Sequence, residues 1–139
     1  MKLQRRQRGQ SMVEFVLMLP ILLIILLGLL DLGRLWYAYV AVTDAAAEGA
    51  TYAAINPPTS DDDISQICQR AQDASGGLVQ IDPDAVDVEL VSSGSSPSVI
   101  VTVDYTFTLA TPLLHAIVPE GHLLLRSRAN EVILSGQLP

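Results

Sequence analysis

An acidic side chain stands at the start of a long apolar segment near the N-terminus. Glu14 follows the basic stretch Arg5–Arg8, and the sixteen residues from Phe15 to Leu30 carry no charge. A carboxylate inside an apolar helix costs several kcal/mol in lipid unless it is paired. Glu14 therefore needs a partner, and the free α-amino group of an adjacent subunit would be a suitable one. The alternative is an ordinary snorkelling residue at the membrane edge.

The residues before Glu14 suggest how such an amino group could arise. If a peptidase cuts after Gly9, Gln10 becomes the new N-terminus and Glu14 its fifth residue. This is similar to the spacing that type IV pilin-like proteins show at a class III leader. Gly9 and Gln10 are the candidate cleavage residues, and Glu14 and Phe15 are the candidate residues for subunit assembly.

The apolar segment has nearly the length of a membrane span. Sixteen helical residues cover roughly 24 Å, and the apolar flanking residues make up the difference to a hydrocarbon core of ~30 Å. The flank includes Trp36, Tyr37 and Tyr39, which are suited to a membrane interface, whereas the arginines lie on the other side. We expect a cytoplasmic N-terminus and an extracytoplasmic body. A cleaved secretory signal is the alternative, but Asp31 and Arg34 directly follow the apolar run.

The helix that begins in the apolar segment should extend well beyond it. The sequence favours a helix from about Ser11 to Ile55, because proline next appears at Pro57, and the residue before a proline is pushed out of the α region. Pro20 should kink or loosen this helix. Small residues recur along it at three- and four-residue spacing. They are Ala38, Ala41, Ala45, Gly49 and Ala53. This row would let the helix pack closely against the head or against neighbouring copies, although alanine also simply favours helix.

The remaining residues predict a small α+β head. Ser60 and the acids Asp61–Asp63 are typical of a helix start, and Gly76 and Gly77 of its end. Apolar residues alternate with polar ones over 86–90 and 99–109, which predicts an antiparallel hairpin covering the helix. Residues 111–118 could form a short helix. Residues 123–134 could be a third strand or a helix, and periodicity alone does not decide between them.

The fold class expected for the whole chain is therefore α+β. A long N-terminal pilin-like helix precedes a small head with about three antiparallel strands and one or two short helices. The expected divisions are a basic leader over 1–9, a helix over 10–56 with its transmembrane part at about 13–37, and a head over 57–139.

Charge and composition argue against several other functions. The formal net charge is −7, and without the four basic residues before position 9 the balance falls to −11. Such an acidic body repels phosphate backbones, which disfavours nucleic acid as a partner. Cys68 is the lone cysteine, and His115 and His122 have no third ligand in a recognisable frame, so we expect no metal and no cofactor. No catalytic motif is recognisable, which argues against an enzyme.

The ordered set of N-terminal motifs resembles the TadE family of the tight-adherence (Flp) pilus machinery. The resemblance rests on RRQRGQSMVEFVLMLPILLIILLGLLDLGRLWYAYVAV, on the small-residue helix through Ala46 to Ala54, and on the strand-like VIVTVDYTFTL and LLLRSRANEVI. It includes the acidic-x-Gly-Arg motif at Asp31 to Arg34, whose charged ends could also pair as a local structural contact.

The resemblance implies a minor pilin, or pseudopilin, held in the inner membrane with its head outside. The implied partners are a prepilin peptidase, other pilins such as a TadF-like pseudopilin and the Flp major pilin, the inner-membrane assembly platform and the lipid bilayer. Phe15, where major Flp pilins usually carry Tyr, and the folded head both favour a minor component. The alternative is an uncleaved single-pass membrane protein whose head acts as an extracytoplasmic interaction module.

Overall fold

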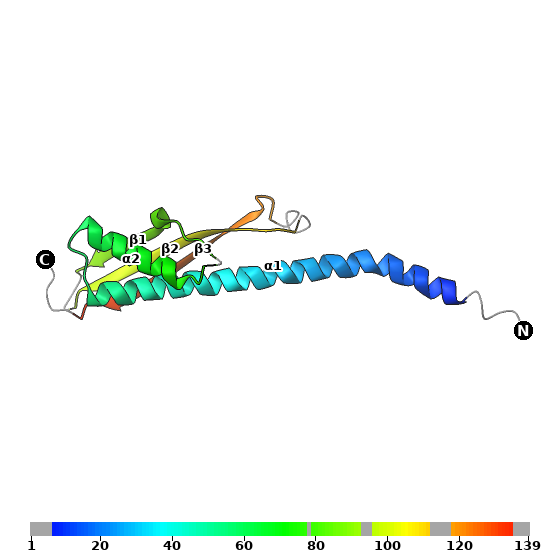
Figure 1. Ribbon diagram of the computed structural model, residues 1–139, viewed down its shortest axis with the longest axis horizontal. Helices are drawn as coiled ribbons and strands as arrows, with labels where there is room; N and C mark the ends of the chain where they lie inside the picture. Colours follow the sequence, from blue (N-terminus) through cyan, green and yellow to red (C-terminus); the bar gives the residue numbers. More distant parts are fainter. Residues whose placement is uncertain (1–6, 78, 93–95, 112–117, 135–139) are drawn as a thin grey trace, which may run out of the picture. The chain divides into compact units, whose positions relative to one another are not determined.

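The computed structural model describes residues 7–77, 79–92, 96–111 and 118–134. Its elements are helix α1 (Gln7–Ile55), helix α2 (Asp61–Ala74), the short 3-10 helix η1 (Pro83–Ala85), and strands β1 (Val86–Val91), β2 (Ser98–Thr108) and β3 (His122–Val132) (Figure 1). The fold is mixed α+β with a long N-terminal apolar helix, a shorter second helix and a three-stranded antiparallel sheet, as the sequence predicts.

Helix α1 begins earlier than the sequence analysis placed it. It starts at Gln7 instead of Ser11, because Gln and Arg are good helix formers and a single glycine does not stop a helix. It continues through Pro20 and ends at Ile55, where the backbone N–H of Asn56 still donates to the Tyr52 carbonyl at 2.9 Å. The following Pro57 excludes a further turn, which confirms the predicted end of the helix.

The described chain divides into two compact units. One contains α1 up to Arg34 together with residues from Leu109–Gly121, and the other contains Leu35–Thr108 and the chain from His122 onward. The first unit combines the apolar part of α1 with the connection between β2 and β3. The second unit contains the sheet, α2 and the C-terminal half of α1.

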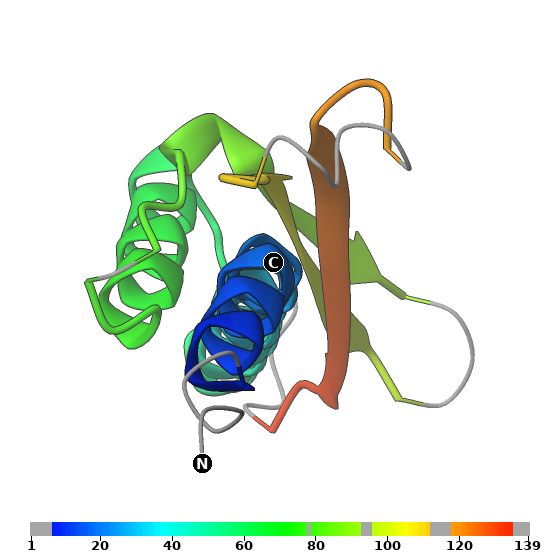
Figure 2. The ribbon, with the colours of Figure 1, turned by 90° about the vertical axis from the view of Figure 1, so that its right-hand side faces the viewer.

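In the second unit, two helices share one face of the sheet. The strand order is β1-β2-β3 with antiparallel neighbours, and the C-terminal half of α1 and α2 lie on the same side of it (Figure 2). The three elements meet at Gly49, where a side-chain Cβ would lie 3.2 Å from Val101 on β2 and 3.4 Å from Ala71 on α2. A glycine at this position allows α1 to approach the sheet closely.

The core of this unit follows the alternation of β2. Val99, Val101 and Val103 are fully buried, as are Val42 of α1 and Ile67 of α2. The third apolar segment is strand β3, which pairs with β2 over its whole length, from Ser98↔Val132 to Thr108↔His122. This pairing shows that the segment over 123–134, which periodicity left open between strand and helix, forms a strand as far as Val132.

Local side chains fix the start of α2 as predicted. Ser60 is the N-cap, and the Asp63 carboxylate accepts hydrogen bonds from the backbone N–H and hydroxyl of Thr59, both at 2.9 Å. These bonds hold the pKa of Asp63 below its usual value. Gly76 and Gly77 adopt positive φ after the last turn. The short helix expected over 111–118 falls mostly on residues 112–117, which lie outside the described residues.

Candidate functional site

The N-terminal half of α1 leaves its apolar side chains uncovered. Between Met12 and Leu32 the large apolar residues are 37–71% exposed, and they include Met12 at 71% and Leu17 at 68%. The helix is long and apolar enough to cross a membrane. Burial in a compact core would cover one side of such a helix, so exposure all around it indicates lipid or neighbouring helices as its surroundings.

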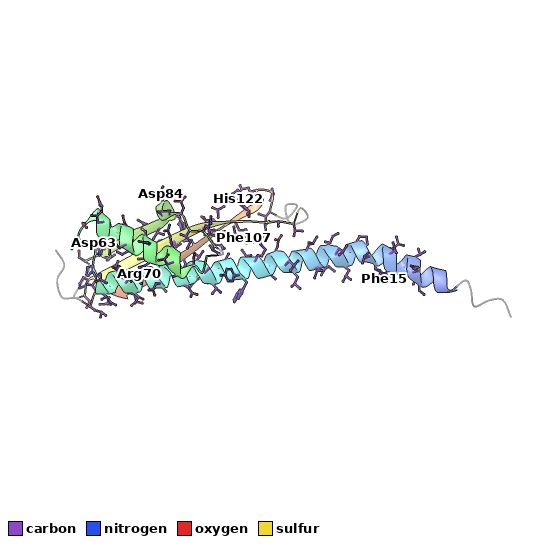
Figure 3. All side chains as sticks on the ribbon, viewed as in Figure 1. Phe15, Asp63, Arg70, Asp84, Phe107 and His122 are labelled. Carbon is purple, nitrogen blue, oxygen red and sulfur yellow. The ribbon has the colours of Figure 1, made fainter. Side chains whose placement is uncertain are left out.

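The predicted assembly residues lie on this uncovered surface. Gly9 and Gln10 are exposed within the helix, and Phe15, labelled in Figure 3, is 61% exposed. The Glu14 carboxylate accepts a hydrogen bond at 3.3 Å from the side-chain amide of Gln10, one turn before it. Among the side chains that the structure describes, no cation forms an ion pair with Glu14. The carboxylate is therefore open to a partner from another chain.

A second carboxylate on α1 has the opposite environment. Asp31 is 2% exposed, and its oxygens accept the backbone N–H groups of Thr111 at 2.7 Å and Ala110 at 3.2 and 3.3 Å. The guanidinium of Arg34 lies 3.2 Å away on the same helix. Asp31 thus has a cation and two backbone donors, which offsets the cost of placing a charge at the end of an apolar helix.

Thr111 makes a further bond that strengthens this attachment. Its hydroxyl donates to the carbonyl of Leu27 at 3.3 Å, one helical turn before Asp31. The chain that leaves β2 is therefore fixed to α1 by both the backbone and the side chain of one residue. Asp31, Arg34, Ala110 and Thr111 together are called the Asp31 site below.

Sequence reasoning found only half of the Asp31 site. The i, i+3 pair of Asp31 and Arg34 was predicted and is present. The two backbone donors were missed, because an N–H group carries no residue-type signal. The rule applied to Glu14, that a carboxylate in an apolar helix needs a partner, applies equally to Asp31 and would have indicated that another segment must reach it.

The row of small residues on α1 lies within the second unit. Ala45 and Ala53 are completely buried, Ala38 and Ala41 are at most 5% exposed, and Gly49 is also buried. The row is therefore covered by its own chain, and at Gly49 the neighbours are Val101 of β2 and Ala71 of α2.

The described residues contain no group of three or more His, Cys, Asp or Glu side chains that could hold a metal ion. His115, considered with His122 in the sequence, lies outside the described residues. Cys68 is half-buried, and burial raises the pKa of its thiol, which lowers its reactivity as a nucleophile.

A comparison with protein families finds a match to most of helix α1. Residues 9–51 match the family described as TadE-like protein. The chain carries a TadE-like segment. No curated protein and no solved structure shows significant similarity to it. The TadE-like segment comprises most of α1, from Gly9 through Glu14 and the Asp31–Arg34 pair to Gly49. This match and the exposed apolar helix are the two findings on which the function proposed below rests.

Proposed function

We propose that this protein is a minor pilin, or pseudopilin, that takes part in assembly of a Tad (type IVc, Flp) pilus. The observation that carries the proposal is Glu14, an exposed carboxylate with no described cationic partner, in the part of α1 from Met12 to Leu32 whose large apolar side chains are all exposed. Such a helix is suited first to lipid and then to a bundle of similar helices, in which a neighbour supplies the missing cation.

The proposed maturation step is hydrolysis of the peptide bond between Gly9 and Gln10 by a prepilin peptidase. Water adds across the bond, so Gly9 leaves as a carboxylate and Gln10 gains a free amino group, which is protonated at neutral pH. Removal of the leader also removes four of the eight Lys and Arg residues. The new ammonium group can then pair with Glu14 of an adjacent subunit, while Phe15 packs against the neighbouring helix.

The proposed topology places the N-terminus in the cytoplasm and the head outside the inner membrane. Residues 1–9 would be the leader, 10–56 the helix with its membrane part at about 13–37, and 57–139 the head. The partners would be the prepilin peptidase, a TadF-like pseudopilin, the Flp major pilin and the inner-membrane assembly platform. The described features point to binding rather than catalysis.

The test is the intact mass and N-terminal sequence of the protein purified from membranes of cells that contain their own prepilin peptidase. We expect a chain beginning at Gln10. A Gly9→Leu variant, which alters only the residue before the cut, should keep residues 1–9 and serves as the control. A wild-type chain that still begins at Met1 would contradict processing and would leave an uncleaved, membrane-anchored interaction module as the function.

A further inference from the structure

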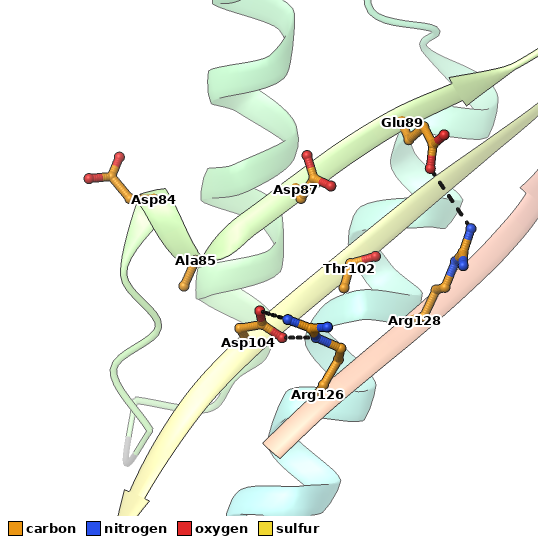
Figure 4. Close-up of a pocket in the computed structure, with 8 residues that line it drawn as sticks. All are labelled: Asp84, Ala85, Asp87, Glu89, Thr102, Asp104, Arg126 and Arg128. Atoms are coloured by element: carbon orange, nitrogen blue, oxygen red, sulfur yellow. Dashed lines mark hydrogen bonds and ion pairs between the residues drawn. The ribbon is translucent and has the colours of Figure 1, made fainter. Parts of the chain in front are cut away.

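The two edge strands of the sheet, β1 and β3, carry side chains of opposite charge on one face. On the face away from the helices, β1 carries Asp87 and Glu89, whereas β3 carries Arg126 and Arg128 (Figure 4). The two arginines are 63% and 60% exposed, and Glu89 is 62% exposed. Within one chain, Arg126 pairs with Asp104 of β2 at 2.6 Å, and Arg128 reaches across β2 to Glu89 at 3.8 Å (Figure 4). The Glu89–Arg128 contact is long and exposed on both sides, so it is weak and its partners can exchange. Among the described residues, Asp87 has no ion pair in its own chain.

The backbone of β1 is open to a further strand at two residues. The N–H of Val86 caps η1 by donating to the Pro83 carbonyl, so Val86 points away from β2. Successive residues of a strand point their backbone groups to alternate sides, so Val88 and Leu90 point away from β2 as well. Among the described residues, no backbone group bonds to β1 at Val88 or Leu90 beyond its ladder with β2. Four hydrogen-bonding groups are therefore open at this edge.

The other side of β3 pairs with no strand among the residues that the structure describes. The N–H of Ile133 donates to the Pro97 carbonyl, which continues the ladder between β3 and β2. The odd-numbered residues of β3 therefore direct their backbone N–H and C=O groups toward β2. The even-numbered residues from Leu124 to Val132 consequently direct their N–H and C=O groups to the free edge. Arg126 and Arg128 lie among them, so the open edge of β3 has basic side chains beside it.

A shallow groove lies next to the open part of β1. It has a volume of about 260 Å³ and lies between the start of α2 and the strand, with Pro58, Ile64, Val88 and Leu90 in its lining. Ile64 and Leu90 are 37% and 40% exposed. A strand added to β1 would cover these apolar side chains, and its own apolar residues would point to the same face of the sheet.

Charge decides which strand can occupy this edge. Two β1 strands side by side would bring Asp87 and Glu89 of both copies together, and two β3 strands would do the same with Arg126 and Arg128. Like charges in cross-strand positions are destabilising, and opposite charges are stabilising. The two unlike edges are the combination that the charges favour, and β3 also offers the half-buried Leu123 and Leu125 to the groove.

We propose that the head of this protein binds a second copy of itself by strand addition, with β3 of one copy pairing with β1 of the next. Both strands are antiparallel to β2, so they run in the same direction and would pair in parallel when the sheet is extended sideways. The contact is heterologous, which leaves one free β1 and one free β3 at the ends of any row of copies. It is independent of leader cleavage and of the helix contacts of α1.

The proposal can be tested by cysteine cross-linking of the full-length protein in its native membranes. Two differently tagged copies are expressed together in a Cys68→Ser background, one with Glu89→Cys and the other with Arg128→Cys. Directly paired strands bring Cβ atoms to about 5 Å, close enough for oxidation to a disulfide or for a short thiol cross-linker. Asp87→Cys and Arg126→Cys, tested in the same combinations, cover the neighbouring registers.

We expect cross-linked dimers containing both tags to exceed same-tag dimers several-fold in at least one combination. Cells that express only the Glu89→Cys or only the Arg128→Cys copy are the matched controls and should yield little dimer. Equal or greater same-tag dimers would contradict the pairing of unlike edges. Absence of a mixed dimer in all four combinations, or cross-linking of these cysteines to other proteins instead, would overturn the proposal.

Charge reversal gives a second, independent measurement. Among the described residues, Asp87 forms no ion pair in its own chain, so Asp87→Lys changes the charge of the β1 edge without breaking such a contact. This change in one copy should reduce the mixed dimer several-fold, because both edges then carry positive charge. Asp73→Lys on α2 makes the same charge change away from the edge and should leave the mixed dimer unchanged. An equal yield of mixed dimer with Asp87→Lys would contradict a pairing selected by charge.

Discussion

The backbone N–H of Thr111 donates to the carboxylate of Asp31 at 2.7 Å, a bond between residues that are 80 positions apart. It attaches the start of the connection between β2 and β3 to the end of the apolar part of α1. Asp31 is buried, and its carboxylate and the backbone N–H groups of the connection provide each other's hydrogen-bond partners.

Replacing Asp31 with Asn should release residues 110–111 from the helix. The amide keeps the shape of the side chain but loses the charge, and a hydrogen bond to a charged group contributes roughly 1.5–3 kcal/mol. Because about 1.4 kcal/mol corresponds to a tenfold change in an equilibrium, the amide of Thr111 should exchange its hydrogen at least ~10-fold faster. Hydrogen exchange measured by mass spectrometry on the detergent-solubilised protein checks this.

The matched control for this change is Arg34→Gln. Arg34 belongs to the same site, but its side chain is 55% exposed, so its contribution is screened by solvent. Exchange at Thr111 should rise much less than in Asp31→Asn. Equal effects of the two substitutions would mean that the ion pair, and not the backbone bonds, holds the loop.

Glu14→Ala should abolish pilus assembly while membrane insertion persists. The substitution makes the helix more apolar, so insertion is not impaired, but it removes the carboxylate proposed to pair with a neighbouring N-terminal amine. Surface pili counted by electron microscopy and protein recovered from the membrane fraction give the two readouts. Glu48→Ala removes another exposed carboxylate from the same helix and should leave assembly intact. Normal pili with Glu14→Ala would refute the assigned role.

The elements of this fold were predictable where the signal is local. Ser60 with Asp63 marks the start of α2, Asn56 before Pro57 marks the end of α1, and the alternation around Val101 marks β2. Each depends on neighbouring residues, whose types directly restrict the backbone. The strand β3 was ambiguous, because its apolar run fits helix and strand equally and only pairing with β2 distinguishes them.

The candidate site was predictable only in part for the same reason. Glu14 was proposed from its distance to Gly9, which is a sequence property, and its role stays a prediction. The partners of Asp31 were not, because Ala110 and Thr111 act through backbone N–H groups that every residue except proline possesses. The position of Gly49 between two elements likewise depends on the packing of distant segments.

Gly49 should tolerate no large side chain. A Cβ at this position would lie 3.2 Å from Val101 and 3.7 Å from Ile67, both of which are fully buried and cannot easily move. Gly49→Leu should therefore destabilise the head by about 1–3 kcal/mol, the usual cost of overpacking. In Gly49→Ala, the gain in helix propensity of up to about 1 kcal/mol should offset much of the close contact.

Thermal unfolding of the detergent-solubilised variants measures this difference. A Cβ at Gly33, on the same helix, would meet no described atom within 4 Å, so Gly33→Leu is the control and should cause little loss. If Gly49→Leu unfolds at the wild-type temperature, the close approach of α1 to β2 is wrong.

The ion pair of Asp104 with Arg126 should make the stability of the head depend on pH in the acid range. Both guanidinium contacts to the carboxylate are 2.6 Å, and they hold the pKa of Asp104 below its usual value. A carboxylate with a lowered pKa in the folded state stabilises the fold at neutral pH, and this contribution is lost as the pH falls below about 4. Asp104→Asn should therefore be less stable than the wild type at pH 7, and the gap should close toward pH ~2.5.

Unfolding temperatures measured at both pH values check this expectation, with Asp73→Asn, an exposed carboxylate on α2, as the control. The sign of the change is the decisive result. Protonation of Asp104 removes its ion pair with Arg126 from the wild type, and Asp104→Asn removes the same ion pair at every pH. The unfolding temperatures of the two proteins should therefore converge only at acid pH. A gap that widens with acid would show that the neutral form of Asp104 is the one that stabilises the sheet, and that Arg126 does not act through its charge.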